Sequence, residues 1–391
     1  MTPQRFAYVF KRFPVFAQTF VVREVEGVFR HNREPAIFTI QPPEDAFRQD
    51  GFSEMEDRLT LFPSKFALTA RIFSNAFSGK IPFQVILNPR WLLKENRAKR
   101  EALWLGPELK SRGITRLHTH FTTEAARTAW WVRRLFGIPY SITAHANDFL
   151  CSRDTAPSLE HLVSDAQAVI AVSEFSKNWF KTNFPDAKIH RVYNGMLLDD
   201  FVPPKTSKPP RILSIGRLVE KKGFPDLVKA CRLLLDKGFE FECGIVGEGP
   251  IREHLVSIIA DLELSEHVKL YGALPQREIK MLLHQSSIFA LACVNEKSGG
   301  MDILPTVITE AMAAGLPVVS TSLAGIPEMV VDQVTGLLTN PGDVAALSDS
   351  LTKLISHSET AISMGVEGRR RAEKVFNEEV TIPDLLGILE S

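Results

Sequence analysis

Residues 294–317, VNEKSGGMDILPTVITEAMAAGLP, carry the side chains best suited to chemistry. Pro305 suits the first turn of a helix and Gly315 suits its end, so Thr306 to Ala314 is predicted to be a short helix. The first N–H groups of such a helix lack intrahelical partners, and the aligned peptide dipoles add about half a positive charge there. That helix end would attract a phosphate group.

Two carboxylates flank the predicted helix: Asp302 lies just before it and Glu310 lies on its second turn. An acid beside a phosphate site is well placed to accept hydrogen bonds from sugar hydroxyls. The same two residues also suit a simple helix cap and a solvated glutamate. This segment alone favours neither interpretation.

The composition indicates a soluble globular protein of more than one domain. A chain of 391 residues exceeds the usual size of a single hydrophobic core, and 45% apolar with 24% charged residues is ordinary for a folded protein. Lys plus Arg equals Asp plus Glu at 46 each, so the chain has no net field that would gather nucleic acid. Any basic surface must be local.

The cysteines and the apolar segments bear on the compartment. Cys151, Cys231, Cys243 and Cys293 are scattered without metal-site spacing, which predicts free thiols in a reducing compartment. The N-terminal residues lack the pattern of a signal peptide, and no apolar run is long enough to span a membrane. A cytoplasmic location is expected, with peripheral contact to the inner membrane face still open.

The first half of the chain alternates between short apolar runs and helical patterns, as expected for a parallel α/β sheet. A helix is predicted in VVREVEGVFR and others at Thr123–Phe136 and Glu174–Thr182. Strands are predicted at Phe6–Phe10, Ala36–Ile40, Arg116–His120, Tyr140–Thr143, Ala168–Val172 and Ile189–Tyr193.

Polar side chains follow several of these strands, where ligands bind in open α/β sheets. They are Gln18, Thr19, His118, His120, His145, Asn147, Asp148, Ser173 and Asn194. Gln18 and Thr19 suit an ordinary helix cap equally well, and a single histidine at a strand end is usually structural. Several polar groups at one sheet edge favour a cleft.

The stretch from about 42 to 114 has weaker periodicity and mixes basic and aromatic residues, including Trp91 and Trp104. Between residues 65 and 104 this mixture could mark a helix that lies on anionic lipid. A solvated helical face with inward-packed aromatics is the more common explanation.

Residues 199–210, DDFVPPKTSKPP, read as a linker because they are rich in proline and lack apolar periodicity. The strand and helix alternation then begins again. It predicts an N-terminal domain over 1–198, a C-terminal domain over 211–370, and a helical segment over 371–391 that packs back on the N-terminal domain. The predicted strands of the second half are Arg211–Ile215, Glu240–Val246, His267–Tyr271, Ile288–Cys293 and Pro317–Thr321, and its helices are Pro225–Asp236, Ile251–Leu262 and Gln276–His284.

A loop with two cations, GRLVEKKGF, follows the first strand of the second half. Arg217 and Lys222 could both reach a ligand at the strand edge, and two fixed cations suit a diphosphate. The loop lacks P-loop spacing. GEGP at 247–250 is weak by itself, because a turn explains it equally well.

SIGRLVEKKGF, IVGEGP, LYGALP, TEAMAAGLPVVST, AGIPEMV and VTGLL occur in this order in the second half. Together they closely resemble glycosyltransferase family 4, whose members are retaining enzymes of the GT-B fold. VYNGM and ITAHANDF extend the resemblance into the first half, and FPVFAQTFVVREV is similar to the polysaccharide-assembly branch. The resemblance implies two Rossmann-like βαβ domains that face each other across a cleft.

The resemblance also implies roles for single residues. Arg217 and Lys222 match the pair that binds the donor diphosphate, and Glu310 matches the acid that holds the nucleotide ribose. Asp302 occupies the first acidic position of the family's acid-x7-Glu motif, which contacts the transferred sugar. His145 matches a histidine near the reacting sugar, so the expected catalytic set is His145, Asp302, Arg217 and Lys222.

The remaining expected contacts fall into two groups. Backbone groups on the donor side would belong to Gly247 and Leu274 beside the base, and to Ile303, Leu304, Thr306 and Val307 near sugar and phosphate. The acceptor side is expected to include Gln18, Thr19, His120, Asn147 and Asp148.

Two positions depart from the family pattern. Asp302 is one methylene shorter than the usual glutamate, which alters its reach. Ile303 stands where glycine is typical, and a β-branched residue resists positive φ and close backbone approach. Both departures bear on how the donor would be held.

The implied reaction moves a sugar from a nucleotide diphosphate sugar to a hydroxyl of a glycan or lipid-linked saccharide. The two cations and the helix amides would stabilise the leaving diphosphate, so no metal or cofactor is expected, and the sequence contains no DxD. The sequence does not distinguish among UDP-, GDP- and ADP-sugars as the donor. Replacing Arg217 or Lys222 by alanine is expected to lower activity with little loss of stability.

Two other functions stay open at the level of sequence. A GT-B epimerase or phosphorylase would use the same cleft with a different acceptor. A non-catalytic partner subunit would bind nucleotide or scaffold an assembly, and the unusual Asp302 and Ile303 fit that alternative.

Overall fold

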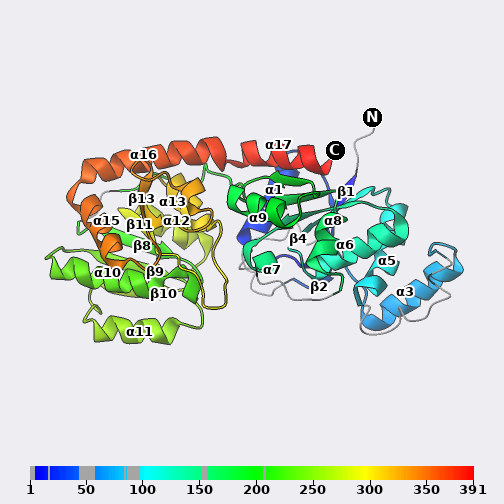
Figure 1. The fold of residues 1–391 in the computed structure, drawn as a ribbon, viewed down its shortest axis with the longest axis horizontal. Helices are drawn as coiled ribbons and strands as arrows, with labels where there is room; N and C mark the ends of the chain where they lie inside the picture. The colour runs from blue at the N-terminus through cyan, green and yellow to red at the C-terminus, as the bar shows by residue number, and fades with distance from the viewer. Residues whose placement is uncertain are drawn as a thin grey trace. The chain divides into compact units, whose positions relative to one another are not determined.

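A computed structural model shows the fold (Figure 1). It describes residues 5–15, 18–43, 58–82, 85, 97–150, 156–205 and 208–391, apart from the side chains at 147 and 148. The chain forms two compact units. The first contains residues 1–172, 176–195 and 381–391, and the second contains residues 173–175 and 196–380.

The first unit is built on a seven-stranded parallel sheet with the order β3-β2-β1-β4-β5-β6-β7. Its strands are β1 Phe6–Arg12, β2 Ala36–Gln41, β3 Leu59–Leu61, β4 Arg116–His120, β5 Tyr140–Ala144, β6 Ala168–Ala171 and β7 Ile189–Arg191. The helices that accompany them are α1 Thr19–Arg30, α3 Lys65–Phe77, α5 Arg97–Ser111, α6 Glu124–Phe136, α7 Ala146–Leu150, α8 Leu159–Ser164, α9 Glu174–Asn183 and α17 Glu378–Leu389.

Strand β1 lies between two hydrophobic cores. Phe6, Tyr8 and Phe10 belong to a core that includes side chains of α1 and α17. Ala7 and Val9 point the other way, into a core that includes side chains of α5 and α6. Successive strand residues face opposite sides of a sheet, so a central parallel strand covered on both faces is apolar throughout.

The second unit is built on a six-stranded parallel sheet with the order β10-β9-β8-β11-β12-β13. Helix α10 packs against α15 and α13 packs against α16, and Figure 1 shows α10 and α16 on opposite sides of the sheet. The strands are β8 Arg211–Ile215, β9 Glu242–Val246, β10 Val268–Gly272, β11 Ile288–Leu291, β12 Val318–Thr321 and β13 Gly336–Thr339. The helices are η4 Glu220–Lys222, α10 Phe224–Asp236, α11 Arg252–Asp261, α12 Gln276–His284, α13 Thr306–Ala313, α14 Ile326–Met329, α15 Val344–Ser356 and α16 Ser358–Val375.

The two sheets confirm the predicted α/β class with two Rossmann-like domains. The predicted linker, in its described residues, contains no helix or strand before β8 begins at Arg211. Helix α17 contributes Ile382, Leu385 and Leu389 to the core of the first unit.

The two helices of the basic, aromatic stretch differ in how they bury their rings. On α5, Trp104 is buried against Phe38 and Phe62, and Arg97 pairs with Glu101 at 2.8 Å. On α3, in contrast, Phe66 and Phe77 are 88% and 91% exposed. Trp91 lies outside the described residues. Inward packing therefore holds for α5 and fails for α3.

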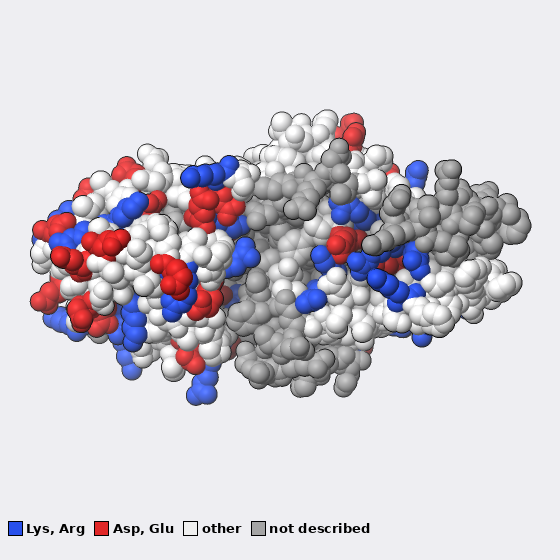
Figure 2. All heavy atoms as spheres, turned by 90° about the horizontal axis from the view of Figure 1, so that it is seen from below, with Lys and Arg blue, Asp and Glu red and all other residues white. Residues whose placement is uncertain are grey.

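The structure also shows how the charged side chains and the cysteines are distributed. Acidic and basic side chains are interspersed over the face of the second unit that Figure 2 shows. Cys231, Cys243 and Cys293 are buried free thiols, and Cys151 lies outside the described residues. Within the described part of the chain, no helix combines the length and the apolar character needed to cross a bilayer.

Candidate active site

Backbone hydrogen bonds join the loops that follow β8, β9 and β10. Gly216 N–H donates to Val246 O at 3.0 Å, and Gly247 N–H donates to Gly272 O at 2.8 Å. Leu218 N–H donates to Glu248 O at 2.8 Å. Because the strands are parallel and adjacent, these loops meet at the carboxyl edge of the sheet, the usual ligand edge of such folds.

Gly247 is required by this junction. It has φ of 141°, and a Cβ at this position would lie 2.0 Å from the carbonyl oxygen of Gly216. Only glycine allows two backbones to approach so closely. The GEGP segment is therefore more than a generic turn, although its contact with a base stays a prediction.

Lys222 and Asp302 form a mostly buried ion pair. The distance from Nζ to Oδ2 is 2.5 Å, and the side chains are 13% and 17% exposed. Lys222 ends the short helix η4 after β8, whereas Asp302 precedes α13. The pair thus joins the cation loop to the segment that leads into the predicted phosphate-binding helix.

The electrostatics of this pair favour two charged groups. Burial lowers the pKa of Lys222, but the neighbouring Asp302 carboxylate outweighs burial and raises it. Burial raises the pKa of Asp302, but the attraction of Lys222 and then Lys221 lowers it overall. Arg217 is exposed, and its charge acts on both members of the pair. The structure therefore brings Arg217, Lys222 and Asp302 together.

Cys293 also belongs to this environment and was not predicted. Its thiol is buried, and burial followed by the Asp302 charge raises its pKa to about 12. A thiol with so high a pKa is not a nucleophile near neutral pH. Cys293 is therefore a buried, uncharged side chain near the ion pair.

Helix α13 confirms the helix predicted from Pro305 and Gly315. Thr306 and Val307 are partly exposed at its first turn, where no side chain caps the amides. Glu310 is 3% exposed on the next turn, so it is not a solvated glutamate. The uncapped amides retain the positive end of the helix dipole.

The segment before α13 accommodates both departures from the family pattern. Ile303 is buried and is not among the residues with positive φ, and its carbonyl oxygen accepts a hydrogen bond from Gly325 N–H at 3.0 Å. Leu304 is also buried. Asp302, despite its shorter side chain, reaches Lys222. Leu274, predicted near the base, is partly exposed after β10.

The first unit places its predicted residues at the carboxyl edge of its own sheet. His120 ends β4, and His145 directly follows β5, the neighbouring strand. Gln18 precedes α1 without a capping hydrogen bond from its side chain, and Thr19 begins that helix. Asn147 and Asp148 are in α7, but their side chains lie outside the described residues.

The two histidines belong to a buried hydrogen-bonded cluster. His120 Nδ1 and His145 Nε2 are 3.1 Å apart, and His120 Nε2 and Glu24 Oε1 are 2.9 Å apart. Tyr8 Oη donates to the same carboxylate oxygen at 2.9 Å. His118 Nδ1 lies 2.8 Å from the hydroxyl of Ser141 on β5. The cluster links β1, α1, β4 and the end of β5.

Glu24 and Tyr8 are missing from the sequence prediction. The signal for Glu24 is its position on α1, three residues after Val21 and four before Val28, which are both buried. A carboxylate on the apolar stripe of a helix needs a buried partner. Here that partner is His120.

Glu24, His118 and His120 also have the composition of a metal site. One possible ligand atom from each lies within 4.8 Å of the others. These atoms already form hydrogen bonds within the protein: His120 Nε2 with Glu24, and His118 Nε2 with Thr143 at 3.1 Å. We assign them to this hydrogen-bonded cluster and infer no metal role.

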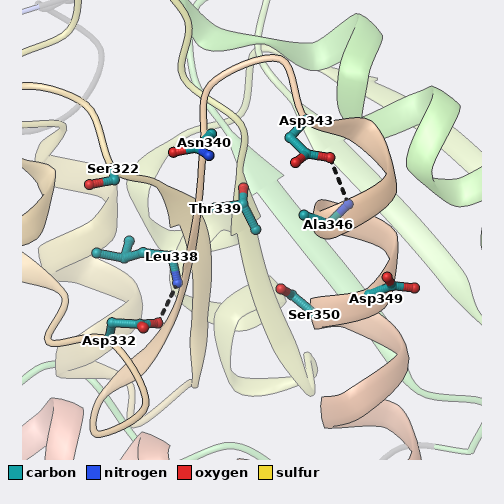
Figure 3. A pocket seen from close by; sticks show the side chains of 9 residues that line it. All are labelled: Ser322, Asp332, Leu338, Thr339, Asn340, Asp343, Ala346, Asp349 and Ser350. Carbon is teal, nitrogen blue, oxygen red and sulfur yellow. Dashed lines mark hydrogen bonds between the residues drawn. The ribbon is translucent and has the colours of Figure 1, made fainter.

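A separate pocket of about 500 Å³ lies where β12, β13 and α15 meet (Figure 3). Asp343 accepts a hydrogen bond from Ala346 N–H and Asp332 accepts one from Leu338 N–H, both at 2.9 Å. Carboxylates disfavour a diphosphate, and no predicted site residue lines the pocket. The lining residues are Ser322, Asp332, Leu338, Thr339, Asn340, Asp343, Ala346, Asp349 and Ser350.

Two sequence-family models match this chain and show which family it belongs to. The sequence model described as "Glycosyl transferases group 1" matches residues 198–371, and that described as "Glycosyltransferase Family 4" matches residues 67–200. The chain belongs to glycosyltransferase family 4. The resemblance predicted from the motifs is thereby confirmed.

Among curated relatives of this family 4 chain is the amylovoran biosynthesis glycosyltransferase AmsK of Erwinia amylovora. It is 40% identical over 47% of this chain and 45% of the relative. The putative colanic acid biosynthesis glycosyltransferase WcaL of Escherichia coli is 30% identical over 60% of this chain and 59% of the relative. The chain thus spans about half the length of the curated relatives it matches.

A solved structure supports the fold of this family 4 chain. Anabaena HepE, crystallised in complex with UDP, superposes with a TM-score of 0.76 at 16% identity, covering 99% of both chains. The solved neighbours are GT-B glycosyltransferases, which confirms the predicted fold class. An identity this low shows the fold alone.

Proposed function

We propose that this chain transfers a glycosyl group from a nucleotide diphosphate sugar to a hydroxyl acceptor, with retention of anomeric configuration and without a metal. The observation that carries the proposal is the buried Lys222–Asp302 pair, which joins the cation loop to the uncapped start of α13. Cation and helix amides suit a diphosphate, and the carboxylate suits sugar hydroxyls.

The ion pair leaves Lys222 able to bind phosphate. An ammonium group has three N–H donors, and Asp302 accepts from one of them. Arg217 is exposed nearby and adds a planar fork that matches two phosphate oxygens. As the sugar–oxygen bond breaks, negative charge grows on the diphosphate, and these fixed positive groups stabilise it.

The acceptor hydroxyl would attack the face from which the diphosphate departs, and the departing phosphate would take its proton. This route retains the anomeric configuration and needs no protein nucleophile. His145 would position and polarise the transferred sugar, and Glu310 would hold the nucleotide ribose. The relatives named for amylovoran and colanic acid biosynthesis favour a glycan or lipid-linked saccharide as acceptor. Buried free thiols are consistent with a cytoplasmic site of action.

The test is an assay of nucleoside diphosphate release from UDP-, GDP- and ADP-sugars, with and without saccharide acceptors. A transferase releases diphosphate faster when the correct acceptor is present, and the anomeric signal of the product matches that of the donor. An isomerised donor would instead indicate an epimerase. A bound nucleotide without turnover would indicate a non-catalytic subunit. Chelating divalent cations should leave the rate unchanged, and a metal-dependent rate would contradict the proposal.

We also propose that α3 contacts an anionic membrane surface. Phe66, Phe73 and Phe77 recur at helical spacing on one face and are 88%, 45% and 91% exposed. Lys65 and Arg71 on the same helix are exposed as well. Aromatic rings beside cations suit the boundary between lipid headgroups and acyl chains.

Sedimentation with vesicles tests this contact. Binding to vesicles that contain anionic phospholipid is expected, and replacing Phe66 and Phe77 by serine should reduce the bound fraction several-fold. In the matched control, serine replaces Val256, which is 45% exposed on α11 of the second unit. This variant should bind to the vesicles like the unchanged protein. Equal binding by both variants would contradict the proposal.

A further inference from the structure

Two phenyl rings flank His145 at the carboxyl edge of the first sheet. The centroid of the Phe20 ring lies 4.7 Å from that of the His145 ring, and the Phe121 centroid lies 4.6 Å from it. Phe20 is the second residue of α1, and Phe121 directly follows β4. Separate elements of the first unit therefore bring both rings to the histidine that the proposed function assigns to the transferred sugar.

Both phenyl rings stay partly exposed although they pack against a hydrophobic core. That core includes Phe10 and Phe13, whose side chains are buried. The planes of the Phe20 and Phe121 rings meet at 64° with their centroids 6.3 Å apart, so the two rings do not cover each other face to face. Aromatic surface is therefore exposed at the sheet edge where ligands bind in folds of this kind.

The backbone at Phe121 is held in an unfavourable conformation. Its φ is 68°, in the left-handed region that bulky residues rarely adopt. Its N–H donates to Thr143 O at 2.9 Å, so the hydrogen bonding between β4 and β5 continues through this residue. Backbone strain of this kind persists where the surrounding structure enforces it, and it gathers at ligand-binding sites. The strain therefore singles out Phe121 among the phenylalanines of this core.

An exposed aromatic face suits one side of a sugar ring. The face of a phenyl ring is the negative part of its quadrupole. The β-glycosides of glucose, galactose and mannose all carry axial hydrogens on C1, C3 and C5, which point to the same side of the pyranose ring. These weakly positive hydrogens can lie on the aromatic face while the hydroxyls at the ring edge bind polar groups. Gln18 and Thr19, which are partly exposed and precede Phe20, carry side chains of that kind.

We propose that Phe20 and Phe121 form a stacking platform for a pyranose ring of the acceptor saccharide, and that they select acceptors by the C–H face of that ring. This inference rests on the proposed function, in which His145 positions the transferred sugar. The acceptor hydroxyl must come next to that sugar to attack it, and both phenyl rings flank the same histidine.

Saturation-transfer difference NMR on the full chain tests the platform without turnover. The probes are the methyl β-glycosides of glucose, galactose and mannose, each at millimolar concentration, and the aromatic signals of the protein are irradiated. Saturation should reach the hydrogens on C1, C3 and C5 more strongly than the other ring hydrogens. The absence of saturation in all of these glycosides would overturn the proposal, and so would uniform saturation of the ring hydrogens.

Leucine variants test which rings transfer the saturation. Phe20→Leu and Phe121→Leu keep an apolar side chain on the core but remove the aromatic face, so the saturation should fall several-fold in each. Phe29→Leu is the matched control, because Phe29 lies at the other end of α1, is partly exposed and packs against the same core. It should leave the saturation unchanged. Unchanged saturation in Phe121→Leu, or an equal loss in Phe29→Leu, would overturn the proposal.

A conservative variant separates loss of stacking from loss of folding. Phe121→Tyr keeps an aromatic face at the strained position and should retain most of the saturation that Phe121→Leu loses. An equal loss in the two variants would show that the aromatic face of residue 121 does not hold the sugar.

Nucleotide sugars distinguish the two possible sources of the sugar ring. UDP-glucose, GDP-mannose and ADP-glucose serve as probes in the same experiment. If saturation that depends on Phe121 reached the sugar of a nucleotide sugar but none of the free glycosides, the platform would belong to the donor and the acceptor assignment would be overturned. Where transfer is detected, Phe121→Leu should raise KM for the acceptor several-fold and leave KM for the donor unchanged. The glycoside spectra need neither nucleotide nor turnover, so a negative result there is distinct from a failure to detect transfer.

Discussion

Lys222 Nζ lies 2.5 Å from Asp302 Oδ2, and neither side chain is more than 17% exposed. This pair changes one expectation from the sequence. Removing a cation from a solvated loop costs little stability, but removing one member of a buried pair leaves an unpaired charge. Replacement of Lys222 should therefore impair folding as well as activity, whereas replacement of the exposed Arg217 should not.

A double-mutant cycle measures the pair. Lys222→Met and Asp302→Asn should each lower the free energy of unfolding of the second unit by about 3 kcal/mol, because each leaves a mostly buried charge without a partner. The double variant should lose less than the sum, with a coupling of roughly 1–3 kcal/mol. Unfolding in urea, monitored by amide hydrogen exchange in β8 and β11, measures these free energies of unfolding.

The chain contains a matched control for this cycle. Lys237 and Asp349 form a Lys–Asp pair at 2.7 Å in the same unit, with side chains 38% and 74% exposed. The corresponding cycle should give a coupling of roughly 0–1 kcal/mol. Equal coupling in both pairs would show that burial does not strengthen the Lys222–Asp302 interaction.

Arg217→Ala isolates the catalytic contribution of a cation. We expect kcat/KM to fall by about 10²–10³-fold, corresponding to roughly 3–4 kcal/mol of transition-state stabilisation, with no change in thermal stability. Steady-state kinetics with the donor identified by diphosphate release would provide the ratio. Arg370→Ala, at an exposed arginine of α16, is the control and should behave like the unchanged enzyme. If Arg217→Ala lowered the melting temperature but kept the specific activity, the role assigned to Arg217 would be contradicted.

Sequence patterns predicted β8 to β12 of the second unit, because these strands are short apolar runs bounded by glycine and proline, but they missed β13. Arg211–Ile215 is observed as predicted, and α13 begins at Thr306 as Pro305 indicated. Strand β3 is only three residues long, from Leu59 to Leu61, and lies in the stretch of weak periodicity. So short an element leaves no period that can be read from sequence.

The loops that carry Arg217, Lys222 and Asp302 were recognisable from the sequence, although the contact of these residues with a donor stays a prediction. Pairing across loops was not recognisable, since nothing in the spacing of Lys222 and Asp302 indicates that the two side chains meet. The hydrogen-bonded cluster that includes Tyr8, Glu24, His120 and His145 was even harder to predict from the sequence. It joins residues from β1, α1, β4 and the end of β5, so only the register of the sheet brings them together.

Gly247→Ala tests the backbone junction between the loops after β8 and β9. A Cβ there would lie 2.0 Å from Gly216 O, so the two loops must separate. We expect a loss of stability of several kcal/mol and weaker nucleotide binding, measured by thermal shift. Gly238→Ala is the control: φ is 81° there, but nothing lies within 4 Å of the added Cβ, so only backbone strain of about 1 kcal/mol is expected. Equal losses would show that the close approach to Gly216 is unimportant.

The buried histidines predict that the first unit loses stability as the pH falls. The pKa of His118 is lowered to about 3 and that of His145 also lies well below its usual value, in both cases chiefly through burial. In the unfolded chain both rings bind a proton near pH 6.5, so below that pH the unfolded state holds more protons than the native state. Stability therefore rises with pH through this window and falls on acidification, by up to about 1.4 kcal/mol per pH unit for each ring. Glu24 acts in the same direction only at lower pH, because its own pKa is lowered and its contribution is lost as the pH falls toward the native value.

Amide exchange of β4 and β5 in urea, compared at about pH 7.5 and 5, should show this loss, and His118→Gln should reduce its slope. A stability that stays constant between those two pH values would contradict the assignment of both rings as buried and neutral.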